Sequence, residues 1–219
     1  MIDIHTHSNP DISTRISYIR NVRYPVDAWP VPVTGYFSVG IHPWDTGRED
    51  LDRNELEEWI NRPHCLAVGE IGLDTMKGPE PKLQKTWFTL QLEIAGKLGK
   101  PVIIHCVRSW DALLDIHSSL THATGWIIHG FRGKPGLAGR LLNAGCYLSY
   151  GSALLSDSRL AESLAQTPLE RLFLETDDSR VPLESIYRQA SQLKGITTTG
   201  LNSYISGNFE RIFGIHANP

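Results

Sequence analysis

Six side chains of the types that bind metals lie near the carboxyl ends of hydrophobic runs in this sequence. The opening MIDIHTH ends in two histidines two residues apart, and four further runs each carry one histidine or carboxylate. The six residues are His5, His7, Glu70, His105, His129 and Asp177. Burying so many polar groups without partners would be costly. A bound metal supplies the partner, because imidazole nitrogens and carboxylate oxygens suit zinc, manganese, iron or nickel.

The size of this set predicts two divalent cations. Four histidines and two carboxylates exceed what one open catalytic metal needs, and Glu70 is the best bridge between two ions. None of the six is a cysteine, which argues against a closed structural zinc site. Two metals about 3.5–4 Å apart can activate a shared water and stabilise a leaving group. The pattern therefore favours a hydrolase.

Short hydrophobic runs alternate with amphipathic stretches along the chain, and they predict the elements that carry these side chains. We expect strands over residues 1–7, 15–21, 36–42, 66–72, 101–106, 125–130, 146–151 and 171–177. We expect helices over residues 49–61, 80–99, 109–120, 134–144, 157–166, 182–194 and 201–213. Because side chains alternate along a strand, His5 and His7 point to the same side.

Eight strands alternating with helices predict an α/β fold, a TIM (β/α)8 barrel whose active site lies at the carboxyl ends of the strands. The first βα units are abbreviated, since seven residues separate the first two strands and PVDAWPVPVTG (25–35) is an irregular proline-rich connection. We found no domain boundary, so we expect one domain over 1–219.

Composition limits the class of protein further. A net charge of −3 argues against a protein that coats long stretches of nucleic acid, although contact with a few phosphates is compatible with it. Three cysteines without a C-x-x-C spacing fit a reducing compartment. Asp3 and His5 interrupt the apolar start, which argues against a signal peptide, and no apolar run approaches the roughly 20 residues that span a bilayer. We therefore expect a cytoplasmic protein.

With these residues placed, the sequence resembles the TatD family of metal-dependent hydrolases over nearly its whole length. The matching stretches are DIHTH, VGIHPWD (39–45), AVGEIGLD (67–74), Q..WF..QLEIAGKLGKPVIIHC (84–106), IIHGFRG (127–133), YLSYG (147–151) and RLFLETD (171–177). The chain departs from the family in being shorter and in continuing with DDSRVP after LETD. Arg108 also lies one position away from the arginine of the family pattern.

The resemblance implies a TIM barrel with two divalent cations, and several family members are magnesium-dependent deoxyribonucleases. It assigns one ion to His5, His7, Glu70 and Asp177, and the other to Glu70, His105 and His129. It also places His42 and Arg108 near the substrate. For His42, the alternative is a turn histidine before Pro43.

Other polar and aromatic residues near the strand ends have two interpretations each. We interpret Glu175 as a buried hydrogen-bonding group behind the metal ligands. Asp74 either caps the following loop or orients His7. Arg132 and Lys134 either meet an anionic substrate or are solvated loop charges. Two tryptophans either stack on a base or cover the barrel mouth, and these are Trp44 and Trp110.

The combined hypothesis is a two-metal phosphodiesterase, a deoxyribonuclease that trims ends or single strands. Asp177 and Glu70 are its catalytic residues. A water activated by the metals attacks phosphorus, Asp177 accepts or orients its proton, and Arg108 with the metals balances the phosphoryl charge. We expect magnesium, manganese or zinc as cofactors, DNA or another short or single-stranded phosphodiester as the partner, no membrane and no obligate protein partner.

Two alternatives remain at this point. Related barrels hydrolyse amides, esters and lactones, and fold alone does not fix the bond. A bridging carboxylate at Glu70, where such enzymes use a carboxylated lysine, favours the TatD-like hypothesis. A non-catalytic metal-binding barrel is the second alternative.

Overall fold

Eight strands and seven α-helices follow one another in the computed structural model, which describes residues 1–8, 16–26, 35–119 and 125–216. The strands are β1 Ile2–Thr6, β2 Ser17–Arg23, β3 Tyr36–Gly40, β4 Cys65–Asp74, β5 Val102–Val107, β6 Trp126–Ile128, β7 Tyr147–Tyr150 and β8 Leu172–Leu174. The helices are α1 Arg53–Ile60, α2 Pro81–Leu98, α3 Trp110–Ser119, α4 Pro135–Asn143, α5 Arg159–Gln166, α6 Leu183–Lys194 and α7 Thr198–Phe213. The strands neighbour one another in chain order, as in the predicted (β/α)8 barrel.

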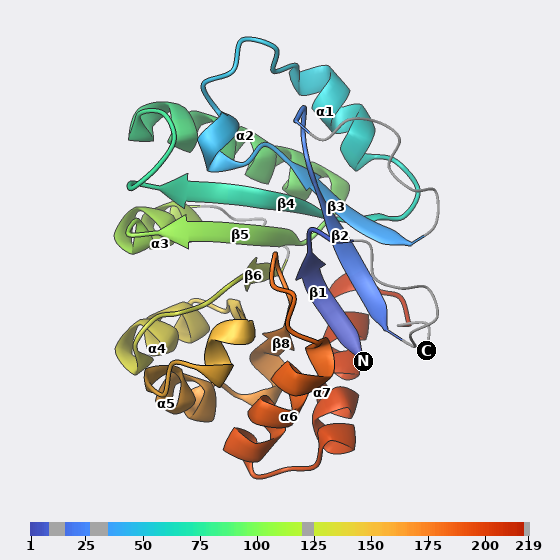
Figure 1. Cartoon of the computed structure of the whole chain (residues 1–219). Helices are drawn as coiled ribbons and strands as arrows, with labels where there is room; N and C mark the ends of the chain where they lie inside the picture. The colour runs from blue at the N-terminus through green and yellow to red at the C-terminus, as the bar shows by residue number, and fades with distance from the viewer. Residues whose placement is uncertain (9–15, 27–34, 120–124, 217–219) are drawn as a thin grey trace. The chain divides into compact units, whose positions relative to one another are not determined.

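The chain divides into two compact units (Figure 1). The first consists of Met1–Ile19 together with Ile127–Pro219, and the second is Arg20–Trp126. Our expectation of a single domain over 1–219 stays a prediction. Most of the predicted proline-rich connection, residues 27–34, lies outside the described residues.

The second unit is built on the parallel strands β3, β4 and β5, with helix α2 packed against β4. The pairing of β4 with β5 is irregular in the middle of β4. Val68 lies opposite Val102, and Ile71 lies opposite Ile104, so one more residue of β4 than of β5 separates the two pairs. This β-bulge contains Glu70, and bulges commonly redirect a side chain beside a functional site.

The first unit contains the parallel strands β6, β7 and β8, and β1 lies beside the chain that follows β8. Ile127 pairs with Tyr147, and Leu148 pairs with Leu172. A parallel bridge joins Thr6 to Asp177, three residues after β8 ends. Helix α7 packs against both β1 and β8, as Figure 1 shows.

Local sequence signals explain where several of the helices begin and end. Asp52 accepts hydrogen bonds from the first backbone N–H groups of α1, and Pro81 opens α2 at a position where no N–H is needed. Helix α2 ends at Gly99, whose φ of 64° is the left-handed conformation that glycine adopts without strain. Such signals account for the agreement with the predicted boundaries.

The structure shortens several predicted strands, and it shortens two of them most. We predicted strands over 125–130 and 171–177, whereas β6 ends at Ile128 and β8 at Leu174. Gly130 and Asp177 both have positive φ angles, of 53° and 56°, which take the backbone out of the extended conformation. His129 therefore lies on the turn that follows β6, and Glu175 and Asp177 lie in the segment that follows β8.

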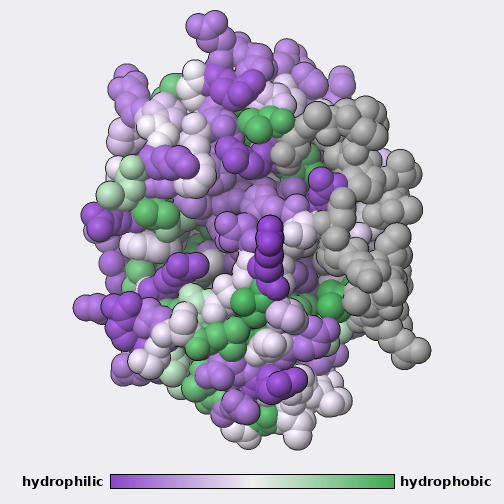
Figure 2. Space-filling view, in the orientation of Figure 1, coloured by the Kyte–Doolittle hydropathy of each residue, from purple (hydrophilic) through white to green (hydrophobic). Residues whose placement is uncertain are grey.

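Side chains of the strands and of the inner faces of the helices form the core, and the face drawn in Figure 2 is mostly hydrophilic. In the first unit the fully buried side chains include Ile4 and Phe173, and in the second they include Val39 and Ile104. The three cysteines are buried and carry free thiols. Among the described residues, we find no helix with both the length and the apolar character to cross a membrane.

Candidate metal centre

In the first unit, the end of β1 brings His5 and His7 to the carboxylate of Asp177. The Asp177 N–H donates to the His5 carbonyl at 3.0 Å, and the His7 N–H donates to the Asp177 carbonyl at 3.1 Å. The Asp177 Oδ1 atom then lies 3.6 Å from His5 Nε2 and 3.4 Å from His7 Nε2. His5 is fully buried, whereas about a third of the His7 and Asp177 side chains is exposed. The backbone thus places three predicted ligands around one position that solvent can reach.

A second carboxylate, Asp3, fixes the backbone beside Asp177. Its side chain accepts hydrogen bonds from the Thr176 N–H at 3.0 Å and from the Thr176 hydroxyl at 2.6 Å. Burial raises the pKa of Asp3 to about 7, against the opposing effect of the Thr176 bonds. These bonds hold the turn in which Asp177 adopts its φ of 56°, an uncommon value for a residue other than glycine. Asp3 therefore positions a predicted ligand without belonging to the predicted set.

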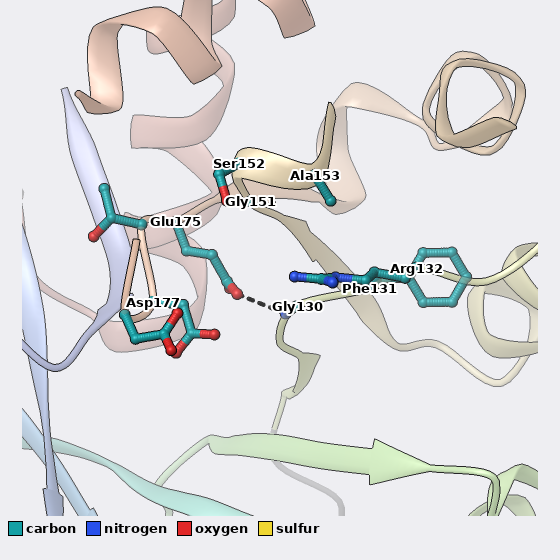
Figure 3. Close-up of a pocket in the computed structure, with 10 residues that line it drawn as sticks. Gly130, Phe131, Arg132, Gly151, Ser152, Ala153, Glu175 and Asp177 are labelled. Carbon is teal, nitrogen blue, oxygen red and sulfur yellow. Dashed lines mark hydrogen bonds between the residues drawn. The ribbon is translucent and has the colours of Figure 1, made fainter. Parts of the chain in front are cut away.

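His129 meets the buried carboxylate of Glu175 in the same unit. Glu175 Oε1 accepts the Gly130 N–H at 2.6 Å and lies 3.3 Å from His129 Nδ1 (Figure 3). A proton on Nδ1 that is shared with Glu175 leaves the Nε2 lone pair available for a cation, the usual arrangement behind a metal-bound histidine. Glu175 is fully buried, so the prediction of a buried hydrogen-bonding carboxylate is confirmed.

In the second unit, Glu70 binds two imidazoles. Its Oε1 atom lies 2.7 Å from His105 Nδ1 and 3.3 Å from His42 Nε2, and all three side chains are at least 87% buried. Burial lowers the pKa of His42, although the Glu70 carboxylate opposes this effect. His42 Nδ1 accepts the Trp44 N–H at 3.2 Å, so the proton of the neutral ring lies on Nε2 and is donated to Glu70. His42 thus orients Glu70. Its predicted role near the substrate stays a prediction.

Asp74 caps the loop that follows β4. Its carboxylate accepts the backbone N–H groups of Met76 at 2.8 Å and Lys77 at 3.1 Å, which bears out the capping alternative. It also accepts the Trp44 indole N–H at 2.7 Å and lies 3.3 Å from His105 Nε2. Burial raises the pKa of Asp74, but the bonds from Trp44, Met76 and His105 outweigh it and keep the pKa below its ordinary value.

Two buried glutamines of α2 hold the backbone beside this cluster. Gln91 accepts the Ile41 N–H at 2.6 Å and donates to the Ile41 carbonyl at 3.2 Å, next to His42. Gln84 makes the same pair of bonds to Asp74, at 2.7 and 2.9 Å. Both glutamines are in the motif that carries the family resemblance, but we had assigned them no role. Their spacing of seven residues places them on one face of the helix, which is the signal that could have revealed them.

Glycines allow β4 to approach β5 closely around Glu70. A Cβ atom on Gly69 would lie 2.7 Å from the Cβ atom of Ile103. A Cβ atom on Gly72 would lie 1.9 Å from the His105 carbonyl oxygen, and the φ of Gly72 is 151°. The GEIG sequence is therefore required by the backbone that presents both Glu70 and His105.

The remaining predicted contact residues lie at exposed or partly exposed positions. Arg108 follows β5 directly, has a φ of 53° and is exposed. Arg132 and Lys134 are also exposed. The Trp44 ring lies against the imidazoles of His42 and His105, and Lys77 Nζ is 3.4 Å from its ring centre. Trp44 therefore covers that cluster, while base stacking by Trp110 stays a prediction.

The described residues fit divalent cations. Within each unit, the ligand atoms of His5, His7 and Asp177, and those of His42, Glu70 and His105, lie within 4.8 Å of one another. Buried carboxylates beside imidazoles, with cysteine absent from these groups, form a donor set that suits magnesium, manganese or zinc. One further oxygen, Glu175 Oε2, is buried and makes no hydrogen bond to the described residues.

Comparisons with known proteins identify the family of this chain. The family model described as TatD related DNase matches residues 28–214. The chain belongs to the TatD family. It is 30% identical over 204 residues to the uncharacterized metal-dependent hydrolase YcfH of Escherichia coli K12, covering 83% of this chain and 75% of that protein. It is also 32% identical over 146 residues to the 3'-5' ssDNA/RNA exonuclease TatD of Edwardsiella piscicida, covering 64% and 56% of the two chains.

A solved structure confirms the fold class of this TatD-family protein. YjjV, a TatD homologue from Escherichia coli K12, superposes with a TM-score of 0.81 over 98% of each chain at 22% sequence identity. The predicted α/β fold with the TIM barrel strand order is therefore confirmed. The chain is a member of a family of metal-dependent hydrolases.

Proposed function

We propose that this TatD-family hydrolase is a two-metal phosphodiesterase that shortens single-stranded DNA from its ends. The observation that carries the proposal is the donor set, in which buried histidines and carboxylates, with no cysteine, gather at the ends of parallel strands in both units. The name of the Edwardsiella relative, a 3'-5' ssDNA/RNA exonuclease, supports the same bond and the same form of substrate.

The proposed ligands are the six residues that the sequence indicates, and these are His5, His7, Glu70, His105, His129 and Asp177. Divalent cations held by them would supply Lewis-acid catalysis and lower the pKa of the attacking water. With such cations bound, Asp177 would accept or orient the proton of that water, because about a third of its side chain is exposed to solvent beside His5 and His7. Glu70 would hold a cation with its carboxylate, and His42 orients that carboxylate by donating from Nε2.

Arg108 is the proposed contact for the phosphoryl oxygens. It is exposed directly after the strand that carries His105, and its guanidinium makes no hydrogen bond or ion pair with another described residue. A planar guanidinium suits the geometry of a phosphate, to which it can donate two parallel N–H bonds.

The test is a cleavage assay on metal-stripped protein. Single-stranded and double-stranded oligonucleotides labelled at the 5' end are incubated after magnesium, manganese or zinc is added back. We expect progressive shortening of the single strand from its 3' end, loss of activity in Glu70→Ala, and unchanged activity in Glu58→Ala, which alters an exposed glutamate on α1.

Two results would overturn the proposal. Equal cleavage by the parent and by Glu70→Ala would show that the metal centre is assigned wrongly. A metal-loaded protein that is inert on every oligonucleotide, but cleaves a panel of amide, ester or lactone substrates, would be a hydrolase of a different bond. Inertness on both panels would indicate a non-catalytic metal-binding barrel.

A further inference from the structure

A pocket in the first unit has acceptors on one wall and donors on another (Figure 3). The segment that follows β8 supplies the carboxylates of Glu175, Asp177 and Asp178. Arg132, in the segment after β6, and Ser152, the first residue of the 3-10 helix Ser152–Leu155 after β7, supply N–H and O–H groups. Figure 3 shows the Arg132 side chain extending into the space beside Glu175. A ligand in this pocket therefore lies between the proposed metal ligand Asp177 and the guanidinium of Arg132.

The Arg132 side chain is exposed. Its guanidinium makes no hydrogen bond or ion pair within the described part of the chain. The acidic residue Asp157 is already bound by Arg159, whose Nε and Nη2 atoms donate to its two carboxylate oxygens at 2.8 and 2.7 Å. These bonds lower the pKa of Asp157, and the charge of Arg132 makes only a smaller contribution.

The backbone on both sides of Arg132 is fixed, so its side chain starts from a defined position. Phe131 is buried, and its N–H donates to the Ser149 carbonyl at 2.8 Å. On the other side, the Gly133 carbonyl accepts the Ser163 hydroxyl at 2.8 Å. A Cβ atom on Gly133 would lie 2.5 Å from the Phe131 ring, so only glycine fits there. A rigid base reduces the entropy lost when a side chain binds a ligand.

We propose that Arg132 binds a phosphate of the substrate strand from the wall of the pocket opposite Asp177. The inference rests on the proposed function and deepens it, because it names the residue that selects a negatively charged diester. A phosphate between a cation on the Asp177 side and the guanidinium is neutralised from both directions, whereas a neutral ester leaves the charge of Arg132 uncompensated. Arg132 therefore makes the enzyme selective for phosphodiesters over carboxylic esters.

The experiment compares Arg132→Met and Arg132→Lys with the parent on a labelled single-stranded oligonucleotide. The matched control is Arg188→Met, which removes the same charge from an exposed position on α6 of the same unit. We measure KM and kcat with added metal, and the dissociation constant by fluorescence anisotropy in EDTA, each at several salt concentrations. Circular dichroism and thermal melting confirm that the variants are folded.

We expect Arg132→Met to raise KM and the dissociation constant about tenfold, the usual effect of losing one charge-assisted hydrogen bond. Losing one phosphate contact also lowers the slope of log affinity against log salt by about 0.7 for a single strand. Arg132→Lys should retain the slope and recover part of the affinity. A purely structural role would not change the salt slope.

The outcomes separate this inference from the proposed function. If the parent cleaves the oligonucleotide, and Arg132→Met has the same KM, dissociation constant and salt slope as the parent, the proposed role of Arg132 is wrong. The proposed phosphodiesterase activity is not affected by that result. A parent that cleaves no oligonucleotide overturns the proposed function. In that case the anisotropy titration decides, because equal affinities of the parent and Arg132→Met would also reject the phosphate contact.

Discussion

Replacing Gln91 by leucine tests whether its carboxamide holds the backbone beside His42. The Gln91 side chain is fully buried and satisfies both backbone groups of Ile41, which is itself fully buried. Leucine has a similar volume and no polar atoms, so the substitution removes the two hydrogen bonds without leaving a large cavity.

The expected magnitude follows from the two groups left without partners. An unsatisfied buried N–H or carbonyl costs about 1–3 kcal/mol, so Gln91→Leu should lower the free energy of unfolding by about 2–6 kcal/mol. For a chain of 219 residues, each kcal/mol corresponds to roughly 2–4 °C in Tm, which gives a decrease of about 4–24 °C.

The assay is urea unfolding of the metal-free protein, followed by far-ultraviolet circular dichroism. The control is Glu93→Leu, which introduces the same residue on the exposed face of α2 and should change stability by less than about 0.5 kcal/mol. A loss below about 1 kcal/mol in Gln91→Leu would refute the reasoning, because the Ile41 groups would then have other partners.

Three further predictions concern the metal ligands and the thiols. Asp3→Ala should weaken divalent-cation affinity about tenfold, because Thr176 beside Asp177 loses its acceptors, and Asp3→Asn should be intermediate; equal affinities in a competition with a chelating dye would contradict this. Adding metal at about 100 times its Kd should stabilise the stripped protein by about 2.7 kcal/mol. Asp177→Asn, whose asparagine tolerates a positive φ, should reduce that gain in a thermal melt, and an undiminished gain would exclude Asp177 as a ligand. Burial raises the pKa of Cys65 to about 11 and those of Cys106 and Cys146 to about 12. At pH 8 an aromatic disulfide reagent should therefore label the thiols only as fast as the protein unfolds, and rapid labelling of the folded protein would show that one is accessible.

Much of the fold could be predicted from the sequence, because its signals are local. Apolar alternation and helical periodicity placed every described strand and α-helix, with most ends displaced by one to three residues, but they did not predict the short 3-10 helices. The predicted strand ends were least accurate where the backbone leaves the extended conformation. Gly130 and Asp177, within the predicted ends of the strands that became β6 and β8, adopt positive φ angles that the hydrophobic pattern does not encode.

The proximity of some candidate ligands was also predictable, although their supporting contacts were not. Strand alternation places His5 and His7 on one side, and the structure brings both to Asp177 within the first unit, while their role as metal ligands stays a prediction. The orientation of Glu70 by His42 could not be predicted, because it depends on a bulge in β4 that places the two side chains together. Sequence spacing gives the face of a strand, but it does not give its register against a neighbour.

The sequence by itself determined the order of the elements, the residue types at the strand ends and membership of the TatD family, because all three are properties of local pattern and motif. Only the tertiary structure decided which groups support those residues. Asp3 reaches Thr176 across 173 positions, and Gln91 reaches Ile41 across 50. Such contacts form when packing brings distant segments together, and the free energy of leaving those buried groups unpaired is what makes them specific.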